Sequence, residues 1–192
     1  YILRAIGRIA FPLFSFLIIY NYIFNTKNKK NYLKRLISFL IISELLFIVF
    51  EQNIINNIFY TLILGLSFIF IFEQQKEDEY NSISKNLITI TIFLFFLFLS
   101  LFTDYEIYGF ILIVSIYLYY KFKNTIFFIL GIITLLLLST IETIGFNLIS
   151  LLLIYIAYNF NVKHNIPRTN KYFFYLFYPF HIILLIYISN LL

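Results

Sequence analysis

The feature of this chain that most constrains its fold is a succession of eight apolar segments separated by short polar connections. Of the 192 residues 62% are hydrophobic and 12% charged, whereas soluble domains are about half apolar and a quarter charged. A bilayer requires every backbone polar group to be satisfied within the chain, so such segments predict helices. We therefore expect an all-α, polytopic transmembrane helix bundle of about eight spans, with residues 1–192 forming a single transmembrane domain. The segments cover residues 3–25, 33–50, 54–72, 87–102, 107–120, 125–139, 144–158 and 172–191.

The number of spans depends on two parts of the chain. The segments on either side of Glu142 are short, and they predict two separate helices, one long interrupted helix or a re-entrant hairpin. The first residue, Tyr1, is not methionine, and no signal-peptide pattern precedes the first segment. We therefore expect one more N-terminal helix before Tyr1 in the natural chain.

The basic residues indicate how the chain is oriented. Twelve of the 14 Lys and Arg lie on the first, third, fifth and seventh connections, and none lies on the second, fourth and sixth. The positive-inside rule then puts the odd-numbered connections in the cytoplasm and both ends of the chain outside. A net charge of +5 could indicate nucleic-acid binding, but the basic residues flank apolar segments. We therefore expect the lipid bilayer, and not nucleic acid, as their partner.

Two arginines break the rule, because they lie toward the outer end of the first segment. Arg4 and Arg8 share one helix face at i, i+4, and Pro12 cannot donate to the carbonyl of Arg8, so a kink is expected there. Arg8 lies about 8 Å into its span and Glu44 about 9 Å from the outer end of the second span, so their depths match. One interpretation is a functional Arg8–Glu44 pair, since intramembrane charges are costly. The alternatives are an ion pair that joins two helices, or arginines that snorkel to the surface.

The other acidic residues outside the third connection also lie toward the outer side: Glu51, Asp104, Glu106 and Glu142. The outer surface therefore carries charges of both signs. We take Arg4, Asp104 and Glu106 as candidates for binding a substrate there.

The last segment contains a second proline break with a histidine beside it. Pro179 leaves the carbonyl of Tyr175 without its helical donor, and His181 lies about 13 Å from the cytoplasmic end, near the middle of the bilayer. A histidine kept neutral by burial is suited to act as a general base, and Tyr178 would stand next to it. The alternative is a structural histidine, with Tyr178 in the interfacial belt.

The basic residues on the connections expected in the cytoplasm have two interpretations. Arg35, Lys34 and Arg168 are candidates for binding the phosphates of a donor, and the alternative is topology signalling with contacts to anionic headgroups. The acidic run at residues 73–79 predicts a solvated loop. The chain has no cysteine and two histidines, and it has no nucleotide-binding or zinc motif, so we expect no metal.

Five parts of the chain resemble the TraX family, in the order and rough spacing of that family. They are IGRIAFPLF at 6–14, NYLKRL at 31–36 with ISE at 42–44, NIFYTL at 57–62, DY at 104–105 with YG at 108–109, and FYLFYPFH at 174–181. The resemblance implies a multi-pass protein of the bacterial inner membrane that acetylates the N-terminus of conjugative pilin, with acetyl-CoA as donor. The family is similar to a wider group of membrane acyltransferases, which transfer an acyl group from cytoplasmic coenzyme A to an acceptor near the outer side.

The chain departs from the family pattern in two places. Family members usually begin with an extra helix that carries an Asp-His pair, and the broader group assigns its base to a histidine in that region. Without that helix, either His181 serves as the base or the protein is inactive. Tyr20 and Asn21 stand where the family tends to have Glu-Gly.

The resemblance, with which the charge distribution agrees, implies an acyl-CoA-dependent membrane acyltransferase whose acceptor is an amine or hydroxyl of pilin or another envelope component. Arg8, Glu44, His181 and Tyr178 are the candidate catalytic residues. Two other functions remain open. A transporter or channel would use Arg8 and Glu44 as a gating pair, and a degenerate homologue would act as a non-catalytic scaffold in the membrane.

Overall fold

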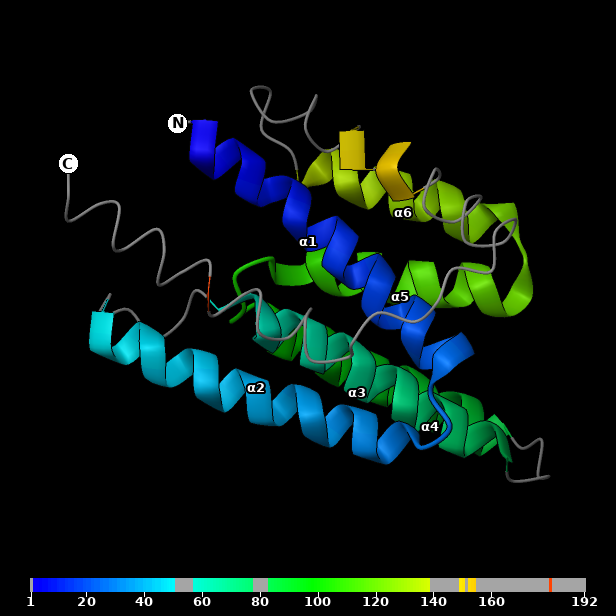
Figure 1. Ribbon diagram of the computed structural model, residues 1–192. Helices are drawn as coiled ribbons and strands as arrows, with labels where there is room; N and C mark the ends of the chain where they lie inside the picture. Colours follow the sequence, from blue (N-terminus) through cyan, green and yellow to red (C-terminus); the bar gives the residue numbers. More distant parts are fainter. Residues whose placement is uncertain are drawn as a thin grey trace.

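The computed structural model describes residues 2–50, 57–77, 83–138, 149–150, 152–154 and 180, with side chains placed from residue 10 to 45, 57 to 75 and 83 to 138 in the long stretches. The described residues contain helices and short connections but no strand, which confirms the all-α prediction. The helices are α1 (Ile2–Tyr20), the π-helix η1 (Asn21–Asn25), α2 (Lys29–Phe50), α3 (Ile58–Glu77), α4 (Ile83–Ser100), α5 (Glu106–Phe122) and α6 (Thr125–Leu137), as Figure 1 shows.

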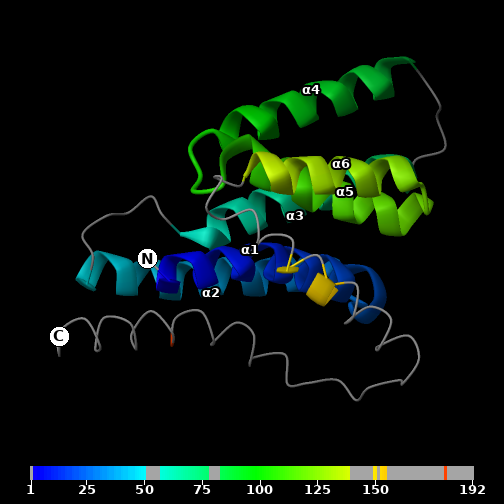
Figure 2. The ribbon, with the colours of Figure 1, turned by 90° about the horizontal axis from the view of Figure 1, so that it is seen from above.

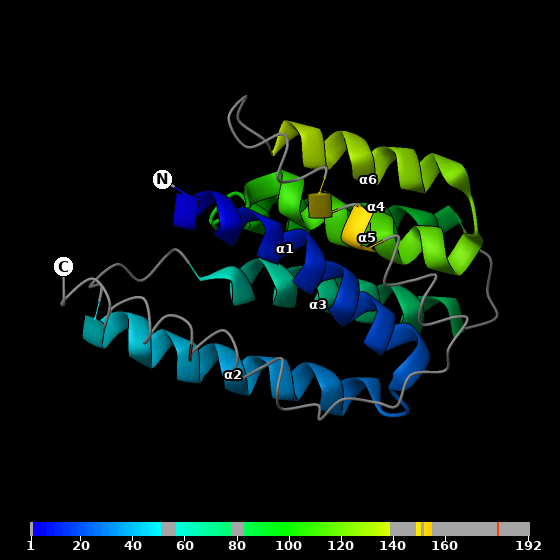
Figure 3. The same cartoon turned by 45° about the horizontal axis from the view of Figure 1, so that its top comes forward.

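The helices form a bundle with α5 near its centre. Helix α5 packs against α1, α3, α4 and α6, whereas α2 packs against α3. Successive helices run in opposite directions (Figure 1), and α2 and α6 lie on opposite sides of α1, α3 and α5 (Figure 3). We call the end where α1, α3 and α5 finish the inner end, and the opposite end the outer end. The basic connections between α1 and α2 and between α5 and α6 therefore lie together at the inner end.

Close packing around α5 depends on small residues and stacked rings. Gly109 on α5 lies where Thr61, Tyr105 and Phe11 meet, and Gly65 on α3 faces Ile113. The rings of Phe11 and Tyr105 are stacked, with centroids 3.7 Å apart and planes 9° apart. Glycine at a membrane helix interface lets backbones approach closely, so these contacts fix how α1, α3 and α5 sit together.

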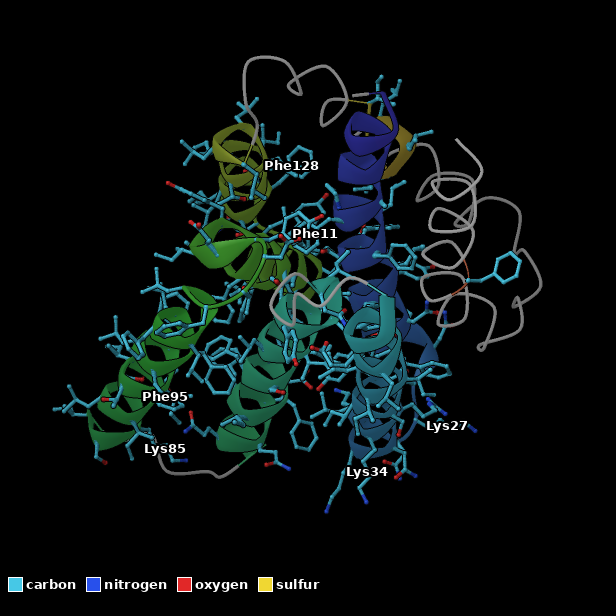
Figure 4. The ribbon with its side chains drawn as sticks, turned by 90° about the vertical axis from the view of Figure 1, so that its left-hand side faces the viewer. Phe11, Lys27, Lys34, Lys85, Phe95 and Phe128 are labelled. Atoms are coloured by element: carbon cyan, nitrogen blue, oxygen red, sulfur yellow. The ribbon has the colours of Figure 1, made fainter. Side chains whose placement is uncertain are left out.

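The outward faces of α4 and α6 are strongly apolar. Phe95 on α4 is 57% exposed and Ile126 on α6 is 65% exposed, and Figure 4 shows Phe95 at the periphery of the bundle. In Figure 2, α4 lies along one side of the bundle, and 6% of its candidate span is buried. An apolar surface of this extent is typical of contact with lipid.

The prediction of eight spans is supported in part. Among the described residues, Ile58–Gln75 of α3 and Ile83–Ser100 of α4 are long and apolar enough to cross a membrane, and Ala10–Asn25 and Thr125–Leu137 are shorter apolar helices. The segments at 144–158 and 172–191 lie largely outside the described residues. The count of eight therefore stays a prediction.

Two local expectations need correction or comment. The start of the acidic run is not a loop, because α3 continues to Glu77. The residues after the apolar part of α3 are good helix formers, and Glu73 finds partners on neighbouring helices.

Helix α1 runs through Pro12 without ending and then loosens into η1. There the Asn21 and Thr26 side chains donate to the backbone carbonyls of Leu17 and Asn21.

The substitution Gly109→Ala tests the packing of α5. A Cβ at this position would lie 2.9 Å from Thr61 Cγ2, 3.0 Å from Phe11 Cζ and closer still to Tyr105 Cβ. We expect the free energy of unfolding to fall by about 1–3 kcal/mol, the usual effect of overpacking. Thermal unfolding of the purified protein in detergent measures the change.

The matched control is Gly131→Ala on α6, where a Cβ would meet its nearest neighbour at an ordinary 3.8 Å. Alanine is the better helix former by about 1 kcal/mol, so this variant should melt at the wild-type temperature or above it. Equal melting of the two variants would contradict the described packing.

Candidate functional site

A network of charged and phenolic side chains surrounds Glu73 at the inner end. Glu73 Oε2 accepts hydrogen bonds from Tyr22 Oη at 2.9 Å and from Lys29 Nζ at 2.6 Å. Glu73 Oε1 accepts one from Tyr117 Oη at 2.8 Å and lies 3.5 Å from Lys121 Nζ. Lys121 Nζ also donates to Tyr117 Oη at 2.6 Å. We call these five residues the inner cluster.

The local structure explains why these side chains converge. Glu73 lies about one turn before the end of α3, and Tyr117 and Lys121 are spaced i, i+4 on one face of α5. Tyr22 lies in η1, and Lys29 is the first residue of α2. The inner cluster therefore joins η1, α2, α3 and α5, and charge-assisted hydrogen bonds of this kind are the stronger ones in proteins.

The aromatic rings of the inner cluster also support its cations. Lys29 Nζ lies 5.0 Å from the centroid of the Tyr22 ring, and Lys121 Nζ lies 5.1 Å from that of Tyr117. The ammonium groups thus combine ion pairing with cation–π contacts. Side-chain exposures of 38% for Lys29 and 30% for Lys121, against 16% for Glu73, leave both lysines reachable from solvent.

Arg35 lies beside the inner cluster on α2. Its guanidinium carbon is 5.7 Å from the centroid of the Tyr32 ring, and that ring is 6.2 Å from the ring of Tyr22. Arg35 Nε is buried and has no hydrogen-bond partner in the described part of the chain. Lys34 is exposed, and Arg168 lies outside the described residues.

A second polar group of side chains lies where α2 and α3 meet at the outer end. Asn57 Nδ2 donates to Ser43 Oγ at 2.7 Å and to Glu44 Oε2 at 3.1 Å, and Asn57 Oδ1 accepts from the backbone nitrogen of Phe59 at 3.1 Å. The Tyr60 side chain also interacts with the Glu44 carboxylate. We call Ser43, Glu44, Asn57 and Tyr60 the outer cluster. Within the described part of the chain, Glu44 Oε1 is buried without a hydrogen-bond partner.

The other predicted site residues are placed as follows. Arg4 and Arg8 lie in α1, but the structure does not describe their side chains, so the Arg8–Glu44 pair stays a prediction. Asp104 and Glu106 are exposed at the outer end, and Glu106 begins α5 with a φ of 46°. Tyr178 and His181 lie outside the described residues.

An apolar groove lies between α1, α5 and α6, beside Pro12. It encloses about 480 Å³ of empty space, its open side included. Ser115 in its lining donates its hydroxyl to the backbone carbonyl of Ile111 at 2.7 Å. The groove is thus suited to hydrocarbon and not to charged groups. Its lining comprises Pro12, Phe16, Leu112, Ser115, Ile116, Tyr119, Tyr120, Phe127, Phe128, Gly131, Ile132, Leu135 and Ile154.

Sequence reasoning missed most of the two clusters. The acidic run predicts a solvated loop for Glu73, which is wrong. The sequence pattern does not single out other members of the clusters, which are Tyr22, Lys29, Tyr117, Lys121 and Asn57. The available signal was weak: a Tyr–Lys pair at i, i+4 next to a helix end on α5, and an asparagine immediately before α3. Among the described residues, no group of three or more His, Asp or Glu could hold a metal ion.

The substitution Glu73→Ala tests whether the inner cluster holds the helices together. It would leave the two lysines without their shared carboxylate and the two tyrosine hydroxyls without their acceptor, and a hydrogen bond to a charged group contributes about 1.5–3 kcal/mol. We expect a clear drop in the unfolding midpoint of the purified protein. Gln74→Ala, at the exposed neighbouring position, is the matched control and should melt like the wild type. Equal midpoints for the two variants would show that the cluster does not bind the helices together.

Comparisons with known proteins give one finding about the family. Neither the curated proteins nor the solved structures include a match to this chain. The family model described as TraX protein matches residues 1–189, nearly the whole sequence. This chain belongs to the TraX family.

Proposed function

We propose that this chain is an acyl-CoA-dependent acyltransferase of the bacterial inner membrane. It would take an acetyl or related acyl group from coenzyme A at the inner end and transfer it to an amine or hydroxyl at the outer end. The acceptor, by the resemblance to the TraX family, is the N-terminus of a pilin or another envelope component. The odd-numbered connections would face the cytoplasm, where the donor is found.

The observation that carries this proposal is a pair of unsatisfied polar atoms on one helix. Arg35 Nε, near the inner end of α2, and Glu44 Oε1, in its outer half, are both buried without a partner in the described residues. A buried polar atom without a partner is costly and calls for an explanation. A guanidinium donor suits a phosphate of the donor molecule, and a carboxylate oxygen suits the N–H or O–H of an acceptor.

The separation of Arg35 and Glu44 along α2 indicates how far apart the two substrates would be held. Glu44 follows Arg35 by nine positions, which corresponds to about 13 Å along the helix axis. The phosphates of the donor would stay at the inner end while its flexible arm carries the thioester outward. The acceptor would meet the thioester near the outer cluster and would not have to cross the bilayer.

The chemical step is a nucleophilic substitution at the thioester. The acceptor nitrogen or oxygen attacks the carbonyl carbon, the carbon–sulfur bond breaks, and the thiol of coenzyme A leaves with a proton. His181 is our candidate for the base that removes the acceptor proton, with Tyr178 beside it. Arg8 would stabilise the negative charge that develops on the carbonyl oxygen, and Glu44, held by Asn57, would orient the acceptor.

The substitution Glu44→Gln tests this assignment, because it keeps the side-chain size and removes the charge. We expect kcat/KM for the acceptor to fall roughly a hundredfold, the lower end of the usual contribution of a positioned acid or base, while the KM for acetyl-CoA changes little. Release of the coenzyme A thiol from protein in proteoliposomes provides the assay.

The control is Ser38→Ala, an exposed position on the same helix, which should leave both constants unchanged. Unaltered turnover by Glu44→Gln would remove Glu44 from the mechanism. Solute flux through the proteoliposomes with no thiol release by the wild type would instead favour a transporter and overturn the proposed function.

A further inference from the structure

The inner cluster has more positive charge than its carboxylate can neutralise. Glu73 is shared by two ammonium groups, Lys29 and Lys121. Arg35 lies on the same helix as Lys29, over the Tyr32 ring, and that ring is 6.2 Å from the ring of Tyr22 in the cluster. Among the residues whose side chains the structure describes, Glu73 is the acidic residue at this end. The other charged side chains that the structure describes there are the cations Lys27, Lys30, Lys34, Lys85 and Lys123. The sequence adds Lys76, Glu77, Asp78 and Glu79, so nine basic residues stand against four acidic ones over the first, third and fifth connections. A surface of this composition attracts anions.

The three cations are held in place by the surrounding side chains. Lys29 and Lys121 lie against opposite oxygens of one carboxylate, and each also contacts a tyrosine ring. The hydroxyl of Tyr32, whose ring supports Arg35, donates to the carbonyl of Ile18 at 3.2 Å. A long basic side chain that is already ordered loses less conformational entropy when it binds. By contrast, Lys27, Lys30 and Lys34 are exposed, as expected of cations that only mark topology.

The cations also keep free hydrogen-bonding capacity. An ammonium has three donors, and Lys29 uses one of them on Glu73. Arg35 Nε has no partner in the described part of the chain. The exposures of Lys29 and Lys121 place their remaining donors within reach of a ligand from the inner end. Glu73 would therefore fix the spacing of the two ammonium groups without cancelling their charge.

We propose that Lys29, Lys121 and Arg35 form a binding site for an organic phosphate, with Glu73 as the residue that positions the two lysines. The ligand class is a diphosphate or phosphodiester anion, which several fixed cations recognise better than one. Two molecules offer this chemistry at an inner membrane surface: the diphosphate of coenzyme A and the headgroup of an anionic phospholipid. The first case rests on the proposed acyltransferase function, whereas the second does not.

Binding measurements on the full chain in phosphatidylcholine nanodiscs test the proposal. The probes are coenzyme A and pantetheine, which lacks the phosphates, and isothermal titration gives the affinities. We expect the double variant Lys29→Gln/Lys121→Gln to bind coenzyme A at least roughly tenfold more weakly and to bind pantetheine like the wild type. Lys30→Gln, an exposed lysine in the same turn of α2, is the matched control and should retain wild-type affinity for both probes.

A second variant separates binding from folding. Arg35→Gln leaves the Glu73 network in place and should also weaken coenzyme A selectively. Equal losses for coenzyme A and pantetheine would indicate a structural defect and overturn the phosphate site. Wild-type affinity of all variants for coenzyme A would also overturn it and would remove Arg35 from the proposed donor site, whereas the transferase activity would still stand, because coenzyme A would then bind through other residues.

A second experiment, with an anionic lipid, identifies the source of the phosphate. The same proteins are analysed by native mass spectrometry from nanodiscs that contain phosphatidylglycerol. Phosphatidylglycerol adducts that disappear in the double variant, with no binding of coenzyme A to any form, would support the phosphate site with a headgroup as its ligand and refute the proposed transferase. The absence of selective adducts together with the absence of coenzyme A binding would refute both.

Discussion

The structure depends on the requirement that polar groups near a hydrocarbon solvent find partners within the protein. Glu73 is the clearest case, because one carboxylate accepts from Tyr22, Lys29 and Tyr117. These partners come from three elements other than its own helix. In a membrane the helices gain little from apolar contact with one another, since lipid is equally apolar. A polar connection between four elements is therefore a major determinant of how their inner ends are arranged.

The two ends of the bundle use polar groups in different ways. At the inner end the carboxylate is saturated and the cations have donors to spare, so this end is suited to an anion. At the outer end Asn57 holds one oxygen of Glu44 while the other oxygen has no partner among the described residues. That end is suited to a hydrogen-bond donor. A reaction that takes a phosphorylated donor from one side and a nucleophile from the other fits this division.

Much of the helical architecture could be predicted from the sequence, because apolar segments are local signals. The described helices follow the first six predicted segments, whereas the matched depths of Arg8 and Glu44 stay a prediction. The partners of Glu73 could not be predicted this way. Tyr22 and Tyr117 are separated from it by 51 and 44 residues, and only the packing of α5 between α1 and α3 brings them together. The acidic composition around Glu73 predicts a solvated loop. Composition shows that residues are charged, but it does not show which distant side chains bind them.

Transfer from a cytoplasmic donor to an outer acceptor requires the inner cluster to face the cytoplasm and the outer cluster to face the opposite side. The chain contains no cysteine, so single cysteines can be labelled without background. The most direct measurement is labelling of Lys30→Cys and Asp104→Cys, at exposed positions on opposite ends, with a membrane-impermeant maleimide on intact spheroplasts. We predict labelling of position 104 in intact spheroplasts and of position 30 only after permeabilisation. Labelling of position 30 in intact spheroplasts, with position 104 protected, would contradict the account.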